Sequence, residues 1–490
     1  MRIDPFRRFA RDRRGNVAMY YGLMAVPLIF AIGMGVDYAN NARKWTQLNA
    51  AADAAALAAV TPTMMQQSDA VAKTAATDMF EGQVSGLTGI TYNPSTNLTI
   101  TITDSGLTRT AQVSYSAQVA NVFSGVLGMN AMTVTGSSTA NGSTPPNVNF
   151  YVLLDTSPSM AIPATQAGIN TMTANTQSQV DGNTKGCAFA CHEYNPAADN
   201  LGNPGGEDNY ALARNLGLTL RIDEVGQAAS AMVSSAISTM NSNQSTYGWT
   251  PTYQIAIDTF DTALHPLYAL TSDLSTLQSN LSANPSPIQA MEVYDNNNIC
   301  TATQTKTKNG VTTTTCTAWS SNSDTDTNID ATLTPLNTSS NANYIPNPGT
   351  GAKGSTPAEV LMIVTDGIED EIVGSVTAGT ADGNRQQAPF AANSNVPSTK
   401  TCAAIKARGI KIAILYTTYY PLDGGATGSW YDSYIYQFQP GGISGDQIGP
   451  DLKNNCASPG LFYQVQVGQD ISAALVTLFQ MALQSSHLTQ

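Results

Sequence analysis

The stretch that most constrains the fold of this chain is Val17 to Val36, VAMYYGLMAVPLIFAIGMGV, which contains no charged residue. Its twenty residues, at the helical rise of about 1.5 Å, extend over about 30 Å, the thickness of the hydrocarbon core of a bilayer. Pro27 lies inside the run, and helices that cross membranes tolerate proline. The stretch therefore predicts one transmembrane helix (17–36) that ties the chain to a membrane.

The charges before this helix predict its orientation. Residues 1–14 contain six Arg and two Asp, a net charge of +4, so the positive-inside rule places the N-terminus in the cytoplasm and exports residues 37–490. A cleaved signal peptide is the rival interpretation. Its apolar region would have about 7–15 residues, whereas this run is longer and continues into an Ala-rich, helix-prone stretch. An uncleaved anchor is the preferred interpretation.

The remainder of the chain is acidic. The net charge of the whole chain is −13, which leaves −17 outside the first fourteen residues. Such a body repels phosphate groups, so we expect no nucleic acid partner and regard cation binding as more natural. Apolar residues make up 42% of the chain, enough for a core, while charged residues make up only 12%, which suits an extracytoplasmic protein.

Six cysteines in an exported chain are expected to pair. Pairing of nearest neighbours would join Cys187 to Cys191, Cys300 to Cys316 and Cys402 to Cys456. A strict two-residue hairpin turn at Asn309-Gly310 places Cys316 opposite Thr303, so the second bond needs a bulge or a wider loop. CAFACH, residues 187–192, resembles half of a zinc site, but no second Cys/His cluster completes it, which favours a disulfide.

The chain divides into four regions, the last of which is the long C-terminal part. Residues 1–60 hold the basic tail, the membrane helix and the Ala-rich helical extension. Within residues 75–140, apolar and Ser/Thr residues alternate with a period of two, which predicts a small β-rich extracytoplasmic region of antiparallel strands. NGSTPPN, residues 141–147, then reads as a linker because of its Gly and two Pro residues.

Residues 147–490 show a different pattern. Apolar runs such as VNFYVLLD, YQIAIDTF, LHPLYAL, EVLMIVTDG, GIKIAILYTTY and LFYQVQV alternate with amphipathic helical segments such as LRIDEVGQAASAMVSSAISTMNS. This pattern predicts an α/β fold, a doubly wound, mostly parallel sheet with helices on both faces. Two polar interruptions, at about 161–216 and 284–358, each carry a cysteine pair, so we expect disulfide-tied insertions there.

Oxygen-bearing side chains follow two of these strands. Asp155 ends VNFYVLLD and Asp366 follows EVLMIVT, and ligand sites in open α/β sheets lie beyond the carboxyl ends of the strands. If the strands are neighbours, the two carboxylates converge, which is costly unless a cation neutralises them. Ser157 and Ser159 add neutral oxygens, a set that suits Mg²⁺, with Ca²⁺ and Mn²⁺ as alternatives.

Two observations would argue against a cation there. A Lys or Arg between Asp155 and Asp366 would take its place, and a large distance between the two carboxylates would exclude a shared ion. The alternative interpretation of the motif is that its Ser and Asp cap the following helix and that TDG, residues 365–367, is an ordinary exit from a strand.

DTSPSM, residues 155–160, with the downstream TDG resembles a von Willebrand factor type A domain, a Rossmann-like fold with a metal-ion-dependent adhesion site. The resemblance implies that the metal lies among Asp155, Ser157, Ser159, Asp366 and a loop threonine. Thr327, in DTDTNIDATLTPL, matches that threonine best, and Thr325, Thr259 and Thr262 are weaker candidates. The family leaves one metal position for water or for a carboxylate of another protein, so the resemblance implies a protein partner that offers Asp or Glu.

The N-terminal part carries a second resemblance. RRGNVA, VDYAN and LNAAADAAALAA, within roughly residues 12–60, resemble the TadE/TadG-like segment of Flp (tight-adherence) pilus assembly proteins, and GLTLRID (217–223) fits the TadG-like branch. The residue five places after Gly15 is Tyr20, where pseudopilin relatives have Glu, which favours a retained anchor. The resemblance implies a single-pass protein of the bacterial inner membrane with a cytoplasmic N-terminus and a periplasmic body. Its Ala-rich stretch would suit close packing against a partner in the envelope.

Taken with the charge pattern, these resemblances predict a membrane-anchored, metal-dependent protein-binding component of pilus assembly or anchoring. A surface adhesin toward host or matrix is one alternative, and a structural domain without bound metal is another. We expect no enzyme, because His192, His265 and His487 have no catalytic context and neither a nucleophile elbow nor a phosphate-binding loop is present.

Overall fold

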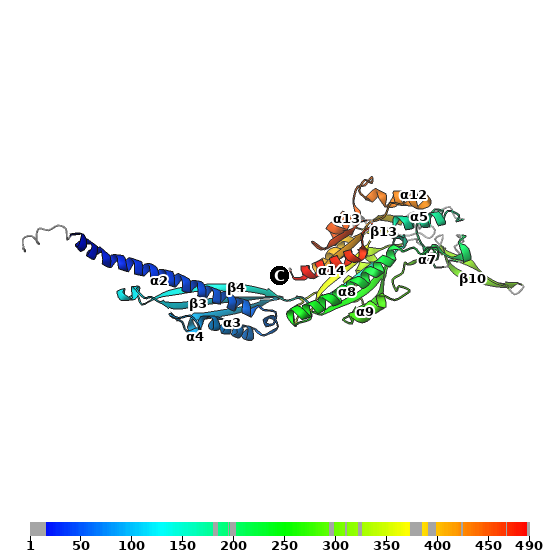
Figure 1. Cartoon of the computed structure of the whole chain (residues 1–490). Helices are drawn as coiled ribbons and strands as arrows, with labels where there is room; N and C mark the ends of the chain where they lie inside the picture. Colours follow the sequence, from blue (N-terminus) through cyan, green and yellow to red (C-terminus); the bar gives the residue numbers. More distant parts are fainter. Residues whose placement is uncertain are drawn as a thin grey trace, which may run out of the picture. The chain divides into compact units, whose positions relative to one another are not determined.

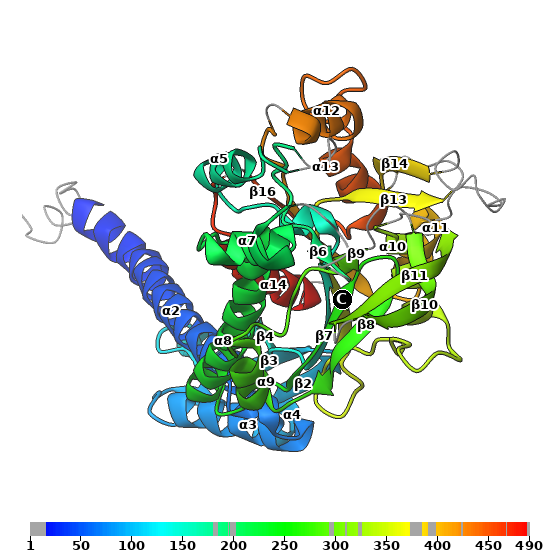
Figure 2. The same cartoon turned by 90° about the vertical axis from the view of Figure 1, so that its right-hand side faces the viewer.

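The structure is a computed structural model, and it describes residues 16–179, 185–194, 196, 202–293, 298–308, 311–321, 326–372, 385–390, 398–422, 425–466 and 468–487. The chain forms two compact units (Figures 1 and 2). The first comprises Met1–Thr144 with Thr246–Trp249, and the second comprises Pro145–Ser245 with Thr250–Gln490.

The first unit is built on one long helix, α2 (Asn16–Ala59), which continues through Pro27. Within the described part of the chain, α2 is the one helix that is long and apolar enough to cross a membrane, by length and composition. The side chains of its N-terminal half are mostly exposed, whereas its Ala-rich half has one buried face. The predicted apolar helix at the N-terminus is therefore confirmed.

The Ala-rich half of α2 packs against an antiparallel sheet of its own unit (Figure 1). The sheet consists of β1 (Ile90–Thr91), β2 (Leu98–Ser105), β3 (Thr108–Ala120) and β4 (Ala131–Ser143), with β3 in the middle. Helix α3 (Asp69–Val84) completes the core, in which Ala52, Ala55 and Ala59 are fully buried. The expectation that these alanines face a partner is wrong, because small side chains here let the helix approach its own sheet closely.

The second unit contains a six-stranded sheet in the order β16-β15-β12-β5-β7-β8. Its strands are β5 (Val148–Asp155), β7 (Tyr253–Phe260), β8 (Leu264–Thr271), β12 (Ala358–Thr365), β15 (Lys411–Thr417) and β16 (Phe462–Val465). Neighbouring strands run parallel except at one edge, where β8 is antiparallel to β7. The reversal at β8 follows from the short connection after β7, since only antiparallel strands can be joined by a tight hairpin.

Both faces of strand β5 are buried, and alternate residues face different helices. Phe150, Val152 and Leu154 belong to a core with α8 (Arg221–Tyr247) and α14 (Ile471–His487). Tyr151 and Leu153 belong to a second core with α10 (Ile329–Asn337) and α11 (Ser398–Ala407). Helices therefore cover the sheet on each side (Figure 2), which explains why the sequence of β5 is continuously apolar.

The segments expected as insertions contain regular structure. Residues 161–216 include α5 (Gln166–Asn175), β6 (His192–Glu193) and α7 (Asn209–Asn215), and residues 284–358 include β9 (Glu292–Val293) and the hairpin of β10 (Asn298–Lys308) and β11 (Val311–Ser321). Further α-helices and strands in the described part of this unit are α9 (Leu274–Leu281), β13 (Ile368–Ile372), β14 (Arg385–Pro389), α12 (Gly425–Tyr434) and α13 (Ile448–Asp451).

The cysteines follow the predicted pairing in part. Cys402 and Cys456 form a disulfide. Cys316 lies opposite Thr303 in the β10–β11 hairpin, as its turn predicts, and the register shifts next to Cys300. The side chains of Cys300 and Cys316 lie outside the described part of the structure, so their bond stays a prediction. Cys187 and Cys191 are not joined by a disulfide, so this expectation is wrong for the structure.

Candidate functional site

The two acidic strand ends lie at the same rim of the second unit's sheet. Strands β5 and β12 are parallel neighbours, with Leu154 opposite Val364, so Asp155 and Asp366 emerge side by side. Both side chains are fully buried, at 0% exposure. The rim therefore concentrates two carboxyl groups where water cannot solvate them.

Hydroxyl groups hold the Asp155 carboxylate from both sides. Ser157 donates to Oδ1 from its hydroxyl (2.6 Å) and from its backbone N–H (3.0 Å), and Thr365 Oγ1 donates to Oδ2 (2.6 Å). The hydroxyls of Ser157 and Ser159 are 3.0 Å apart. Pro158 begins a short 3-10 helix, a position that suits proline, so the loop keeps its geometry. Asp155, Ser157 and Ser159 thus form one connected cluster.

Burial dominates the electrostatics of Asp155. Loss of hydration, and next the neighbouring Asp366 carboxylate, together raise its pKa to about 7 against the opposing hydrogen bonds from Ser157 and Thr365. A carboxyl group with so high a pKa is one whose negative charge lacks compensation. A cation at this rim would supply that compensation.

Asp366 is positioned by a tight turn. Gly367 has a φ of +78°, in the left-handed region that favours glycine, and its N–H donates to Thr365 Oγ1. This turn lets the Ile368 N–H approach Asp366 Oδ1 at 3.4 Å. Within the described part of the chain, Asp366 Oδ2 accepts no hydrogen bond, although it is buried. TDG therefore leaves one carboxylate oxygen available at the rim.

A cationic side chain of the protein also reaches this rim. Arg221, at the start of α8, places Nη1 3.8 Å from Asp366 Oδ2, which is an ion pair but longer than a hydrogen bond. Its Nη2 donates to the backbone oxygen (2.9 Å) and the hydroxyl (2.6 Å) of Thr417, and its guanidinium lies over the ring of Tyr419. Nη1 also donates to the Ser159 backbone oxygen at 3.5 Å, so Arg221 links the Ser159 loop to Asp366 and offsets part of the acidic charge of the rim.

Thr327 is tied to the segment that follows Asp366 rather than to the Asp155 cluster. It exchanges backbone hydrogen bonds with Asp370, at 3.3 and 2.9 Å, and is buried. The next residue, Asn328, caps α10 by accepting from Ala331. The hydrogen bonds of Thr327 in the described structure do not reach Asp155, Ser157 or Ser159.

The weaker threonine candidates differ in position. Thr259 lies within β7 opposite Leu154, and Thr262 donates to Asp261 at 3.3 Å. Thr325 lies outside the described residues.

The donor set fits a hard cation in its chemistry. It comprises two carboxylates and at least two hydroxyls, all oxygen, which is the set that Mg²⁺ and Ca²⁺ prefer. Among the described residues, no group of three or more His, Cys, Asp and Glu side chains is placed to hold a metal, so the hydroxyls are essential to this set. The buried Asp366 Oδ2, which accepts no hydrogen bond, is the atom that most directly fits a cation.

Two contacts at the rim were not predicted from the sequence. Thr365 precedes Asp366 in TDG. Its hydrogen bond to Asp155 could not be predicted without knowing that β5 and β12 are neighbours. Arg221 lies in GLTLRID. The sequence indicates only that this arginine stands at the start of an amphipathic helix. Sequence periodicity places Arg221 near the first turn of α8 but does not say which strand end it reaches.

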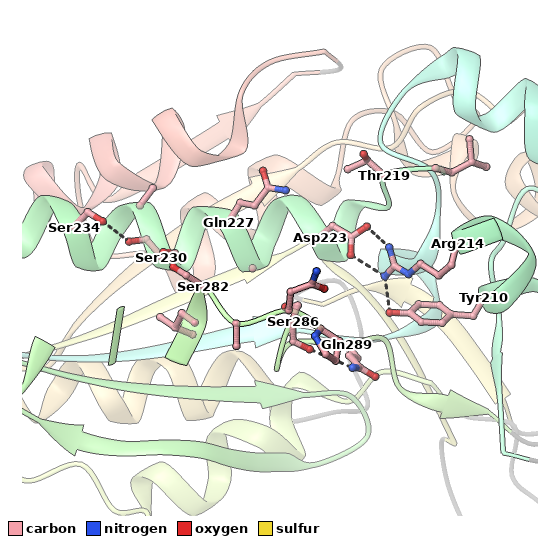
Figure 3. Close-up of a pocket in the computed structure, with 17 residues that line it drawn as sticks. Tyr210, Arg214, Thr219, Asp223, Gln227, Ser230, Ser234, Ser282, Ser286 and Gln289 are labelled. Atoms are coloured by element: carbon pink, nitrogen blue, oxygen red, sulfur yellow. Dashed lines mark hydrogen bonds and ion pairs between the residues drawn. The ribbon is translucent and has the colours of Figure 1, made fainter. Parts of the chain in front are cut away.

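A separate pocket of about 890 Å³ lies beside the N-terminal half of α8. Figure 3 shows Arg214 from α7 and Asp223 from α8 facing each other at one end of it, with Tyr210 beside them. Arg214 Nη2 donates to Asp223 Oδ1 (2.7 Å) and to the Tyr210 hydroxyl (2.6 Å). These two charges neutralise each other, and the rest of the wall offers mainly hydroxyl, amide and apolar groups.

Comparison with known proteins identifies the N-terminal segment. Residues 15–67 match the family described as "Putative Flp pilus-assembly TadE/G-like", so the resemblance of this segment is confirmed. No curated protein matches the chain.

Solved structures of other proteins align with the chain at low similarity. BatB from Bacteroides thetaiotaomicron has 12% identity over 69% of this chain and 99% of its own, with a TM-score of 0.29. The PilB minor pilin from Streptococcus sanguinis has 10% identity, 80% and 79% coverage, and a TM-score of 0.32. The vWF domain of the type V pili tip protein Mfa5 from Porphyromonas gingivalis has 10% identity, 71% and 97% coverage, and a TM-score of 0.29. Scores at this level carry no argument about function.

Proposed function

We propose that this chain, whose residues 15–67 are a TadE/G-like segment, is a membrane-anchored protein-binding component of Flp pilus assembly or anchoring. In this proposal α2 crosses the bacterial inner membrane once, the N-terminus is cytoplasmic and the body is periplasmic. The matched segment contains the whole apolar run of α2, which supports an anchor as part of the role. The role is binding rather than catalysis.

We further propose that the second unit has a doubly wound von Willebrand type A architecture whose rim binds Mg²⁺. Asp155, Ser157, Ser159 and Asp366, with Thr327, would hold the ion. The observation that carries this proposal is the pair of fully buried carboxylates on neighbouring strand ends, with Asp366 Oδ2 accepting no hydrogen bond. A bound Mg²⁺ would offer an open coordination position to an Asp or Glu of a protein partner.

The residues of the chain have separate tasks at this rim. Ser157 and Thr365 fix the orientation of the Asp155 carboxylate through three hydrogen bonds. The Gly367 turn sets the direction of Asp366, and Arg221 limits the charge that accumulates there. The site is thereby preorganised before a ligand arrives.

Removal of one carboxylate tests the site. Asp155→Asn keeps the shape of the side chain but removes its charge, so we expect Mg²⁺ binding to fall by at least about tenfold, since each lost charged hydrogen bond or ligand is worth roughly 1.5–3 kcal/mol. Calorimetric titration of the full chain with Mg²⁺ measures this. Asp432→Asn, at an exposed position on α12, is the matched control and should bind as the wild type does.

Capture of partners from solubilised envelope, with and without a chelator, tests the functional half of the proposal. Wild type and Asp432→Asn should retain a partner only without chelator, and Asp155→Asn should retain none in either condition. Equal Mg²⁺ binding by Asp155→Asn and wild type would show that the site is assigned to the wrong residues.

Arg221 favours a second candidate, a structural domain that binds no metal. Its guanidinium already lies 3.8 Å from Asp366 Oδ2 and brings a positive charge to the rim. If this charge alone satisfies the carboxylates, the wild type gives no heat on titration with Mg²⁺, and Arg221→Gln destabilises the unit whether or not Mg²⁺ is present. If the metal site exists, Mg²⁺ stabilises the wild type and compensates in part for the loss of Arg221.

A further inference from the structure

The first unit exposes an apolar loop at one end of its sheet. The apolar tip, residues 121–132, consists of the loop between β3 and β4 and the first two residues of β4, and it includes the 3-10 helix Ser124–Leu127. Its exposed large side chains are Val122 (70%), Phe123 (41%), Val126 (76%), Met129 (54%) and Met132 (46%). No charged residue occurs from Thr110 to Leu154. A gathered set of exposed apolar side chains marks a surface that contacts something other than water.

The apolar tip is fixed to one level of α2. The carboxylate of Asp37 accepts hydrogen bonds from the backbone N–H groups of Val122 (2.8 Å), Phe123 (3.0 Å) and Ser124 (2.6 Å). One turn earlier in the helix, Gly33 lies against Phe123, so closely that an added Cβ would lie 2.7 Å from the Phe123 Cβ. These contacts set the apolar tip beside the last turn of the apolar run of α2.

The backbone polar groups of the apolar tip are largely satisfied within the unit. Asn41 donates to Asn121 (2.9 Å), whose own amide donates to the Met129 carbonyl (3.0 Å). The backbone N–H groups of Asn121, Gly128 and Met129 donate to carbonyls of the same loop. A loop with its polar groups paired in this way can enter an apolar environment at low cost.

The length of the membrane helix sets the depth of this level. A hydrocarbon core of about 30 Å needs about twenty residues, which is the whole of 17–36. Gly33 lies three residues before the end of that run, so it lies about 4.5 Å inside the core at the helical rise of about 1.5 Å. Tyr38 and Arg43, both exposed, follow at the headgroup level, where aromatic and basic side chains are favoured.

We infer that the apolar tip inserts into the boundary between headgroups and acyl chains of the same bilayer that α2 crosses. Val122, Val126 and Met129 contact lipid, and the Asp37 hydrogen bonds hold the loop at that depth. The inference rests on the membrane anchor, not on the metal site. A lipid surface is the occupant that the position favours, because any bilayer spanned by residues 17–36 must also reach the loop packed against Gly33.

Quenching by lipid tests this insertion. The full chain is reconstituted in phosphatidylcholine vesicles that contain a lipid with a nitroxide near the top of its acyl chain. A fluorescent noncanonical residue replaces Val126 in one sample. In matched samples it replaces Leu23, inside the apolar run, or Ser105, an exposed residue at the end of β2 that pairs with Thr108, the residue of β3 farthest from the apolar tip. We expect the label at 126 to lose about half of its fluorescence, since interfacial side chains reach about 5–10 Å into the boundary region.

The controls decide between occupants. Quenching at 23 and 126 but not at 105 supports the insertion. Quenching at 23 alone overturns it. In that case, energy transfer between labels at 126 that rises with the ratio of protein to lipid would show that a second copy of the chain covers the apolar tip. Absence of quenching at 23 refutes the anchor and the insertion together. The Mg²⁺ titration of the second unit is independent of all three results.

Discussion

Buried acidic side chains of the second unit have their charge compensated in different ways. Asp208 pairs with His192 at 3.1 Å, whereas Asp155 has only hydroxyl and amide donors. Glu359 accepts a hydrogen bond from Asn149, yet burial raises its pKa to about 7. Each uncompensated carboxyl group lowers the stability of the fold at neutral pH, so the acidic composition of the chain has a cost inside the core.

The His192–Asp208 pair predicts a pH dependence. The hydrogen bond to Asp208 raises the pKa of His192 above its ordinary 6.5, and the Glu292 carboxylate acts in the same direction. A raised pKa in the folded state stabilises the fold below pH 6.5, and this stabilisation is lost as the pH rises through the folded pKa. We expect the free energy of unfolding in urea to be higher for wild type than for His192→Gln below pH 6.5. This difference should shrink as the pH rises above that value. A margin that stays constant with pH would contradict the ion pair.

Among single residues, those at strand ends were the most predictable. Asp155 and Asp366 each terminate an apolar run, and this is enough to place both at one rim if their strands pair. Thr327 and Arg221 were not predictable in the same way, because the contacts of a loop and of a helix start depend on tertiary packing. A local sequence pattern contains no information on which strand end either residue meets.

At the scale of elements, the close contact between α2 and the apolar tip requires a glycine at position 33, because there is no room for a Cβ. Gly33→Ala places a Cβ within 2.7 Å of Phe123, so the tip must shift, at a cost of about 1–3 kcal/mol for overpacking. We expect faster amide exchange at Val122 and Ser124, measured by hydrogen–deuterium exchange of the full chain in detergent. Thermal unfolding of the first unit should begin at a lower temperature.

Gly35→Ala is the matched control for this prediction. A Cβ at Gly35 meets nothing within 4 Å, so the substitution should leave the tip unchanged and raise helix stability by about 0.5–1 kcal/mol. If both substitutions have the same effect, helix propensity rather than the contact with Phe123 governs this region.

Elements with clear periodicity were predicted well. The apolar runs became β5, β7, β12, β15 and β16, and the alternating segments became β2, β3 and β4. The alanine run of α2 was predicted to pack against another protein, but it packs against its own sheet. Small side chains indicate close packing without indicating which surface they contact. The elements within the long polar insertions were not predicted, namely α5, α7 and the β10–β11 hairpin. Their sequences lack the regular spacing of apolar residues that marks a helix or a strand.

At the scale of the whole molecule, the two units differ in covalent support. All six cysteines lie in the second unit, where the Cys402–Cys456 bond closes a loop with a sequence separation of 54 residues. A loop of this length contributes roughly 4 kcal/mol through the restricted unfolded state. Calorimetry of the full chain in detergent should therefore show that reductant lowers the unfolding temperature of the second unit and leaves the first unchanged.

Replacement of both cysteines identifies the bond responsible. The double variant Cys402→Ala, Cys456→Ala should unfold at the lower temperature with or without reductant. A variant that still responds to reductant would assign the effect to another pair, and an unchanged wild type would show that the bond adds no stability.

The hydroxyl of Thr365 meets the carboxylate of Asp155 across 210 positions of the chain. A ribosome adds roughly 5–20 residues per second, so β5 emerges on the order of ten seconds or longer before its neighbour β12 exists. During that interval a strand meant to be covered on both faces and both edges has no partner on one side. The rim with Asp155 and Thr365 therefore forms only after the chain has been made as far as β12.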